Sequence, residues 1–186
     1  LAVDRDDTLW IGTGEGLNSI RDGIVTQHPI PGDWFESKIR VILPTRDGAL
    51  WVAGAASLHR LIGGERTKFT TAEGLANNDV RALLEDSAGR LWIGTFGGGL
   101  QCYDRGQFTT YSPTNGLASG FVWALHEDKD GVMWIGTELG LHRLHNGRVT
   151  AYGKAQGLPD NLVNFILEDD QDQLWISHDR GIYRVS

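Results

Sequence analysis

The sequence predicts an all-β fold, a β-propeller built from four-stranded antiparallel blades, and three observations lead to it. First, a short motif with tryptophan at its second position recurs every 41 or 42 residues: LWIGT at Leu9, LWVAG at Leu50, LWIGT at Leu91, MWIGT at Met133 and LWISH at Leu174. Second, the repeats lack the i, i+3, i+4 apolar spacing of helices and hold short runs of β-branched and aromatic residues. Third, a tryptophan fixed in every unit of this length is typical of propeller blades.

The third repeat shows the expected strands in order. VRALLE (80–85) is the first, LWIGT (91–95) the second, GLQCY (99–103) the third and QFTTY (107–111) the fourth, each bounded by turn residues. A D-x-x-G hairpin, DSAG, joins the first two, and its last position suits a positive φ angle. We expect the same angle at the equivalent positions of the other repeats, because glycine and aspartate tolerate it: Asp7, Gly48, Gly131 and Asp172.

These repeats divide the chain into a single propeller segment with units at about 1–41, 42–82, 83–124 and 125–165 and a partial unit at 166–186. The five repeated tryptophans should pack between neighbouring blades. The last unit has no residues for a fourth strand, and an open stack of blades would expose an apolar face at each end. A closed five-bladed propeller is the alternative, with the missing strand supplied by residues preceding Leu1 or by another chain.

Composition argues against several classes of function. The formal net charge is -7 and lysine and arginine are not clustered, so we expect no nucleic acid partner. No apolar run reaches the length of about 18 residues that a membrane helix needs, which predicts no membrane insertion by this segment. The N-terminal LAVDRDDTLW carries no recognisable secretion signal. The single cysteine, Cys102, excludes an internal disulfide.

Three features of the sequence are similar to ligand-binding or catalytic motifs, but we interpret each of them as part of the scaffold. GTFGGGL (94–100) is similar to a nucleotide loop, but a strand is expected after it, whereas phosphate binding needs a helix N-terminus. The acidic clusters at Asp4 and Glu127 lack the spacing of a calcium loop and indicate solvated hairpins. The histidines occupy different strand positions in different repeats, so we predict no metal site, catalytic residue or cofactor: His28, His59, His126, His142, His145 and His178.

The combined repeat, LWIGT..GL.R...G.F..Y....GL....V.AL.ED..G, closely resembles the two-component regulator propeller repeat over the whole chain. This resemblance implies a sensory β-propeller, usually seven-bladed, on the periplasmic or extracellular side of a bacterial inner-membrane receptor. There the propeller is typically followed by a β-sandwich domain, a transmembrane helix and a histidine kinase or diguanylate cyclase. The closing LWISHDRGIYRVS is similar to the last repeat of such propellers. We therefore expect a C-terminal part of a larger ring, partnered by the remaining blades and the β-sandwich.

Ligands of propellers usually meet the face formed by the loops from fourth to first strand and from second to third. One column at this face varies between the repeats: Arg40, Arg81, Trp123 and Asn164. Arginine offers paired donors, tryptophan an aromatic platform and asparagine both a donor and an acceptor, which suits an acidic or neutral saccharide or another small polar ligand. Packing or salt bridges between blades are the alternative role. The hypothetical ligand site also includes neighbouring loop residues: Trp34, Phe35, Glu138, Asp179 and Arg180.

The first functional hypothesis is therefore a ligand-sensing propeller segment that is not itself catalytic. A protein-interaction scaffold, for instance in a homodimer, is the second. The third is an enzyme similar to the streptogramin-inactivating lyases, which also use a propeller repeat but whose second strand is nearer to WFTE than to WIGT. A polar pocket at the channel mouth would favour sensing, whereas a flat apolar patch on the blade rims would favour the scaffold.

Overall fold

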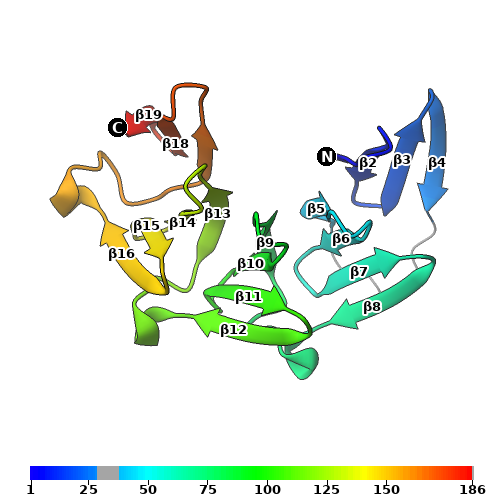
Figure 1. The fold of residues 1–186 in the computed structure, drawn as a ribbon, viewed down its shortest axis with the longest axis horizontal. Helices are drawn as coiled ribbons and strands as arrows, with labels where there is room; N and C mark the ends of the chain where they lie inside the picture. Colours follow the sequence, from blue (N-terminus) through cyan, green and yellow to red (C-terminus); the bar gives the residue numbers. More distant parts are fainter. Residues whose placement is uncertain (29–37, 186) are drawn as a thin grey trace.

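In the computed structural model, which describes residues 1–28 and 38–185, the strands form five antiparallel sheets that follow one another along the chain (Figure 1). The first sheet contains β1 (Ala2–Val3), β2 (Leu9–Gly12), β3 (Leu17–Arg21) and β4 (Ile24–His28). The second contains β5 (Val41–Pro44), β6 (Leu50–Ala53), β7 (Leu58–Ile62) and β8 (Glu65–Phe69). The third contains β9 (Val80–Glu85), β10 (Leu91–Thr95), β11 (Leu100–Asp104) and β12 (Gln107–Tyr111).

The fourth sheet contains β13 (Val122–Glu127), β14 (Met133–Thr137), β15 (Gly140–His145) and β16 (Arg148–Tyr152). The fifth has three strands in the described residues, β17 (Phe165–Glu168), β18 (Leu174–His178) and β19 (Gly181–Val185). Each strand pairs with the next one along the chain, so every sheet is a meander. β9 contacts both β5 and β13, which places the first strands together at the centre and the fourth strands outside (Figure 1). The predicted architecture of propeller blades is confirmed.

The predicted hairpins between first and second strands are confirmed by their backbone angles. Gly89 ends the DSAG turn with φ 81°, and the four equivalent residues also have positive φ: Asp7 at 58°, Gly48 at 81°, Gly131 at 73° and Asp172 at 60°. Aspartate adopts this left-handed conformation more readily than most residues with a side chain, so it can replace glycine in two of the repeats.

An aspartate at the start of four of these hairpins connects the turn to the repeated tryptophan. In the third sheet, Asp86 Oδ1 accepts from the backbone N–H groups of Ala88 and Arg90, at 3.0 and 2.8 Å. Its Oδ2 accepts from the indole N–H of Trp92 at 2.7 Å. The same indole–carboxylate bond joins Trp10 to Asp4, Trp134 to Asp128 and Trp175 to Asp169. The ED column of the sequence therefore stabilises both the turn and the tryptophan orientation.

Acid is expected to weaken the fold through these carboxylates. Burial acts to raise the pKa of Asp86, but hydrogen bonds from Trp92 and Arg90 outweigh it and leave that pKa below its usual value. The pKa of Asp169 is also lowered, chiefly by the Trp175 indole. A carboxylate with a lowered pKa in the folded state adds stability that is present above its unfolded pKa and lost as the pH falls through the folded value. Thermal melts should show a midpoint that is steady down to about pH 5 and falls below about pH 4. A midpoint that stayed unchanged to about pH 3 would contradict this assignment.

The tryptophans pack between sheets, as the sequence predicts, wherever a following sheet is present. Trp51 lies in a buried cluster with Leu91 and Ile93 of the third sheet, and Trp92 lies in one with Met133 and Ile135 of the fourth. Trp10 and Trp134 pack in the same way against the second and fifth sheets. Trp175 belongs to the last sheet and is 38% exposed.

Three short 3-10 helices lie in the connections between successive sheets, from the second sheet to the fifth, and explain the repeated GL pair. They are η1 (Thr71–Glu73), η2 (Pro113–Asn115) and η3 (Lys154–Gln156), and each ends at a glycine with φ near 100°, namely Gly74, Gly116 and Gly157. The following leucines then insert between sheets: Leu75, Leu117 and Leu158. The GL pair thus fixes where each connection enters the next blade.

Apolar side chains are exposed on the two terminal sheets, as expected for an open stack of blades. The first and fifth sheets lie at the two ends of the arc in Figure 1. Large exposed hydrophobic residues gather there: Leu1, Val3, Ile24 and Val25 in the first sheet and Phe165, Leu167, Trp175 and Ile182 in the fifth. These two faces lack the neighbouring blade that buries the equivalent surfaces between the inner sheets.

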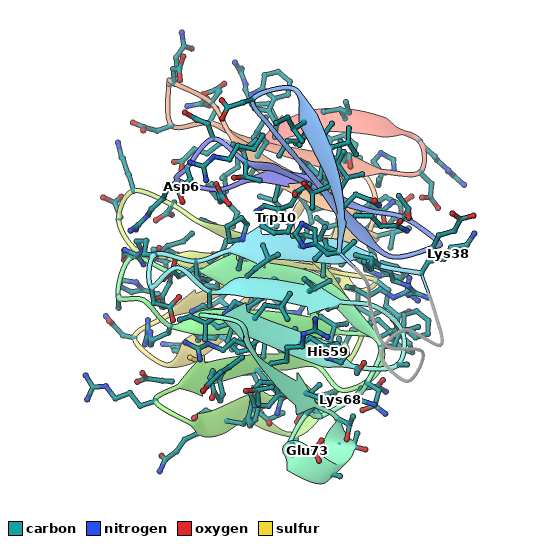
Figure 2. The ribbon with its side chains drawn as sticks, turned by 90° about the vertical axis from the view of Figure 1, so that its right-hand side faces the viewer. Asp6, Trp10, Lys38, His59, Lys68 and Glu73 are labelled. Atoms are coloured by element: carbon teal, nitrogen blue, oxygen red, sulfur yellow. The ribbon has the colours of Figure 1, made fainter. Side chains whose placement is uncertain are left out.

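The loops separate onto two opposite faces of the arc. In the side view of Figure 2, Asp6 of the β1–β2 hairpin lies toward the left and Lys38, which precedes β5, lies toward the right. Because the strands are antiparallel, the loops between second and third strands share the side of Lys38. This side is called the ligand face below, and the side of the first hairpins is called the hairpin face.

Candidate functional site

The variable column predicted from the sequence lies on the ligand face, beside the start of each first strand. Arg81 and Trp123 are the second residues of β9 and β13. Arg40 comes just before β5 and Asn164 just before β17, so these two lie outside the strands that the sequence assigned to them. Trp34 and Phe35 lie outside the described residues.

Asp79 joins two arginines of this column. Its Oδ1 accepts from Arg40 Nη1 at 2.7 Å and from Arg81 Nε at 2.7 Å, while its Oδ2 accepts from Arg81 Nη2 at 2.9 Å. All three side chains are partly exposed. One carboxylate therefore orients two guanidinium groups from neighbouring blades, and the group retains one positive charge. Salt bridges between blades are the alternative role that the sequence predicts for this column, and the Arg40–Asp79 contact is such a salt bridge.

Aromatic rings surround the Arg81 guanidinium. Its Cζ lies 4.7 Å from the centre of the Phe96 ring and 5.2 Å from that of Trp123, within the range of cation–π attraction. Phe96 meets Trp123 edge-on at 5.6 Å and Phe121 edge-on at 4.5 Å. Two blades thus contribute to an aromatic platform, and Phe96, which is 37% exposed, forms its outer part.

The Trp123 indole has an unusual environment. Its ring is partly exposed, but Nε1 is buried and has no hydrogen-bond acceptor among the residues that the structure describes. The other tryptophans of the blades mostly give this N–H to an aspartate. Trp123 is held instead by its packing against Phe96 and Arg81, and it contributes a ring face more than a donor.

The remaining predicted residues form separate contacts on the same face. Asn164 Nδ2 donates to Asp179 Oδ1 at 2.9 Å, which pairs two of them. Glu138 Oε1 accepts from the Ser119 hydroxyl at 3.1 Å. The backbone N–H of Arg180 donates to His178 Nδ1 at 3.2 Å. The structure therefore assembles Arg40, Arg81 and Trp123 into one group and Asn164 with Asp179 into another.

Sequence reasoning missed Asp79, Phe96 and Phe121, which bring the first group together. Phe96 lies in the GTFGGGL loop, which is one residue longer than its counterparts and is followed by the strand β11. Gly97 N–H donates to Gly120 O at 2.9 Å and Phe96 pairs with Phe121 in an isolated bridge, so the enlarged loop reaches the next blade. The sequence did contain one sign of these contacts, because this loop is one residue longer than its counterparts in the other repeats.

Buried polar side chains on the third strands hold the loops beneath this site. Gln101 Oε1 accepts from the backbone N–H of Ala76 at 2.8 Å, and its Nε2 donates to Gly74 O at 3.0 Å. His142 occupies the same position in the next blade, and its Nε2 accepts from the Ala118 N–H at 3.0 Å. Burial lowers the pKa of His142, which favours this neutral acceptor form. Gln101 and His142 therefore position loops.

Three segments of the chain match the family model described as two component regulator propeller, at residues 74–97, 116–138 and 157–180. These three segments are similar to two component regulator propeller repeats. The propeller repeats contain both groups of candidate residues except Arg40, since the first includes Asp79, Arg81 and Phe96 and the second includes Trp123. Asn164 and Asp179 lie in the third.

Solved structures with the same fold include extracellular domains of putative hybrid two component systems and a lyase. The extracellular domain of a putative hybrid two component system from B. thetaiotaomicron, BT3049, is 24% identical with a TM-score of 0.88, over 98% of this chain and 26% of that one. A second such domain, BT4673, is 18% identical with a TM-score of 0.70, over 100% and 35%. Virginiamycin B lyase from Staphylococcus aureus is 21% identical with a TM-score of 0.79, over 100% and 65%. No curated protein sequence matched the chain.

These similarities show that the propeller repeats here form a β-propeller segment. The chain spans about a quarter to a third of the two extracellular domains. Among the described residues, no group of three or more histidine, cysteine, aspartate or glutamate side chains is placed to hold a metal ion. The same part of the chain contains no helix with the length and apolar character needed to span a bilayer.

Proposed function

We propose that this chain is a ligand-sensing propeller segment of an extracytoplasmic bacterial receptor, of the two-component or diguanylate cyclase kind, and is not itself catalytic. The family described by the three matching segments and the extracellular receptor domains among the similar structures support this role. The single observation that carries the ligand site is the Arg81 guanidinium, which stacks on Phe96 and Trp123 and is oriented by Asp79. The remaining positive charge and the exposed aromatic edge suit an acidic or neutral saccharide.

The geometry also indicates how such a ligand would be held. Asp79 uses both oxygens on Arg81, so the guanidinium is pre-oriented and loses little conformational freedom when it binds. A sugar ring would pack its apolar face against Phe96 or Trp123, while a carboxylate or hydroxyl would meet Arg40 or Arg81. Both arginines remain partly exposed while they bind Asp79. The salt bridges between blades are therefore compatible with ligand binding.

Replacing Arg81 or Trp123 by alanine is the test of this site. We expect each change to weaken saccharide binding about 10-fold or more, since each removes a cation–π or stacking contact. Binding would be measured by calorimetry with digalacturonate as the acidic probe and cellobiose as the neutral one. Arg148→Ala, an exposed arginine on the outer strand β16, is the matched control and should bind like the unchanged protein.

Thermal melting of the same variants separates binding from folding, because Arg81→Ala leaves Asp79 paired with Arg40 and should unfold near the original midpoint. A saccharide that binds equally well to both alanine variants would refute the site. In an intact receptor, an unchanged response of the Arg81→Ala, Trp123→Ala double variant would refute the sensing role.

The exposed apolar faces of the first and fifth sheets support a proposal about protein partners. Phe165 and Leu167 on one end and Val25 on the other are large apolar residues at more than half exposure. Between the inner sheets, equivalent surfaces are buried by the neighbouring blade. We propose that these faces pack against further blades of the same polypeptide or a following β-sandwich, with a homodimer as the alternative.

A further inference from the structure

The second sheet departs from its counterparts at the contact that holds the blade tryptophan. In the other four sheets the indole N–H donates to an aspartate six residues earlier, at 2.7 to 2.8 Å. Thr45 stands at this position in the second sheet, and its hydroxyl donates at 2.6 Å to Asp47 Oδ1. Among the residues that the structure describes, none accepts a hydrogen bond from the Trp51 indole. The residue as a whole is 4% exposed, but its Nε1 is not one of the polar atoms buried without a partner, so this N–H is open to the solvent.

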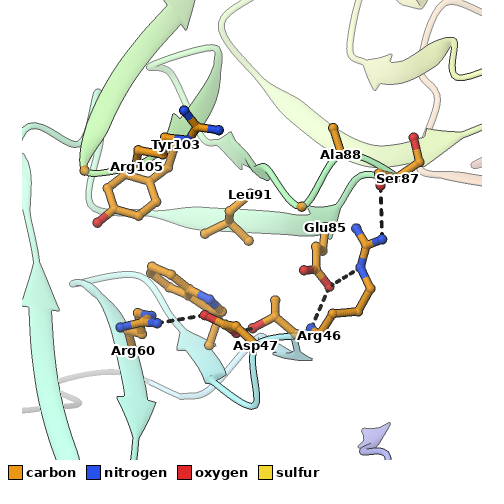
Figure 3. Close-up of a pocket in the computed structure, with 13 residues that line it drawn as sticks. Arg46, Asp47, Arg60, Glu85, Ser87, Ala88, Leu91, Tyr103 and Arg105 are labelled. Atoms are coloured by element: carbon orange, nitrogen blue, oxygen red, sulfur yellow. Dashed lines mark hydrogen bonds and ion pairs between the residues drawn. The ribbon is translucent and has the colours of Figure 1, made fainter.

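A cavity of about 610 Å³ lies beside this tryptophan, between the second and third sheets (Figure 3). Trp51, Leu91 and Tyr103 form its apolar walls, and the hairpin residues Ser87 to Gly89 form part of its rim. Its volume falls in the range of small-molecule sites. The corresponding cavity between the first and second sheets, where Asp4 binds the Trp10 indole, is about 530 Å³, and the one between the third and fourth sheets, where Asp86 binds the Trp92 indole, is about 280 Å³.

Each arginine beside the cavity has a carboxylate close to it. Three arginines line the cavity, against two carboxylates. Arg60 donates to Asp47 at 2.7 Å and Arg46 Nε lies 3.2 Å from Glu85, as Figure 3 shows. The pKa of Asp47 is about 2, because hydrogen bonds from Thr45 and Arg60 outweigh the effect of burial, so this carboxylate is ionised at neutral pH. The third arginine, Arg105, has a side chain that is 94% exposed, 3.9 Å from Asp104.

We propose that this cavity is a second binding site, which takes a small organic acid. The carboxylate of the ligand would accept the Trp51 indole N–H and so replace the aspartate that the four other sheets provide. The guanidinium groups of Arg46, Arg60 and Arg105 line the same cavity and offer further donors to an anion, and Leu91 and Tyr103 offer an apolar wall to the rest of the molecule. We choose a carboxylate as the ligand group because a carboxylate accepts the equivalent indole N–H in the other four sheets.

The test uses benzoate, with benzamide as the uncharged molecule of the same shape. Tryptophan indole N–H signals would be followed by ¹⁵N nuclear magnetic resonance, and the Trp51 signal assigned by its absence in Trp51→Phe. We expect benzoate to shift this signal saturably and benzamide to bind at least about 10-fold more weakly, because it lacks the charge that the arginines attract. A Trp51 signal that benzoate leaves unmoved, or that both molecules shift equally, would overturn the proposal.

Thr45→Asp is the decisive variant, since it supplies the carboxylate from within the chain. The pairs Asp4 with Asp6 and Asp128 with Asp130 already occupy the same two hairpin positions in other repeats, so the substitution fits the fold. We expect it to raise the thermal midpoint by about 3 °C and to weaken benzoate binding at least about 10-fold. Full benzoate affinity in a folded Thr45→Asp protein would contradict the proposed role of the indole.

This inference is independent of the proposed saccharide site. The cavity opens beside the β9–β10 hairpin residues on the hairpin face, whereas Arg81, Phe96 and Trp123 lie at the opposite ends of the strands. Benzoate should therefore shift the Trp51 signal in Arg81→Ala protein as it does in the unchanged protein. Failure of one site would leave the other untouched.

Discussion

Replacing Asp86 by alanine is expected to lower the free energy of unfolding by about 3 kcal/mol. This carboxylate is fully buried and accepts four hydrogen bonds, from two backbone N–H groups, the Arg90 side chain and the Trp92 indole. Alanine would leave the buried Trp92 indole without an acceptor, and the partly exposed Arg90 side chain without its ionic partner. Because Trp92 is part of the cluster between the third and fourth sheets, the loss should reach beyond the hairpin.

Urea denaturation followed by tryptophan fluorescence would measure this loss. Asp130→Ala is the matched control, because Asp130 is an exposed aspartate in the equivalent hairpin of the next blade. We expect the control to change the unfolding free energy by less than about 0.5 kcal/mol. A loss of under about 1 kcal/mol for Asp86→Ala would show that the indole–carboxylate link is not a major source of stability.

Replacing Gly136 by alanine is expected to cost about 2 kcal/mol, because a single methyl group has no room there. A Cβ at this position would lie 2.7 Å from the backbone oxygen of Val163 and 2.8 Å from its Cγ1. Since one of these atoms is backbone, the neighbouring chain must move to admit the methyl group. Gly94 is the same residue of the WIGT motif one blade earlier, and a Cβ there would lie 2.6 Å from Val122 Cγ1. Glycine is therefore needed at this position because the next blade approaches closely.

Gly14→Ala is the control for this prediction, since a Cβ there meets nothing nearer than 3.8 Å and the backbone φ is not left-handed. Thermal melting should show a midpoint lowered by about 5 °C for Gly136→Ala and by little for the control. Equal midpoints for the two variants would mean that the blades separate easily enough to accept the methyl group.

The strands and turns could be predicted because the chain repeats them. The DSAG turn illustrates this, since its positive φ at Gly89 follows from turn chemistry and recurs at Asp7 and Asp172. The pairing of Asp86 with Trp92 could not be derived in the same way, although both columns were visible. The two residues are six positions apart, and their side chains meet only because the hairpin folds the end of the first strand back toward the second. The sequence pattern alone does not specify this backbone geometry.

The candidate site was predicted in part, for a related reason. Arg40, Arg81 and Trp123 were found because they occupy one varying column. Asp79 and Phe96 were missed because their importance arises between blades, where Asp79 reaches Arg40 of the preceding sheet and Phe96 reaches Trp123 of the following one. The exceptional Thr45 is visible in the sequence as a break in the aspartate column, but its consequence depends on a contact that only the structure shows.

The central claim is that a ligand is bound by the Arg81, Phe96 and Trp123 group, in the column where the blades differ. Its most direct test is the indole ¹⁵N spectrum of the protein, which has seven tryptophans, during titration with digalacturonate. We predict that the Trp123 signal, assigned by its absence in Trp123→Phe, shifts saturably and that Arg81→Ala abolishes the shift. Binding detected by calorimetry while the Trp123 signal stays in place would contradict the claim.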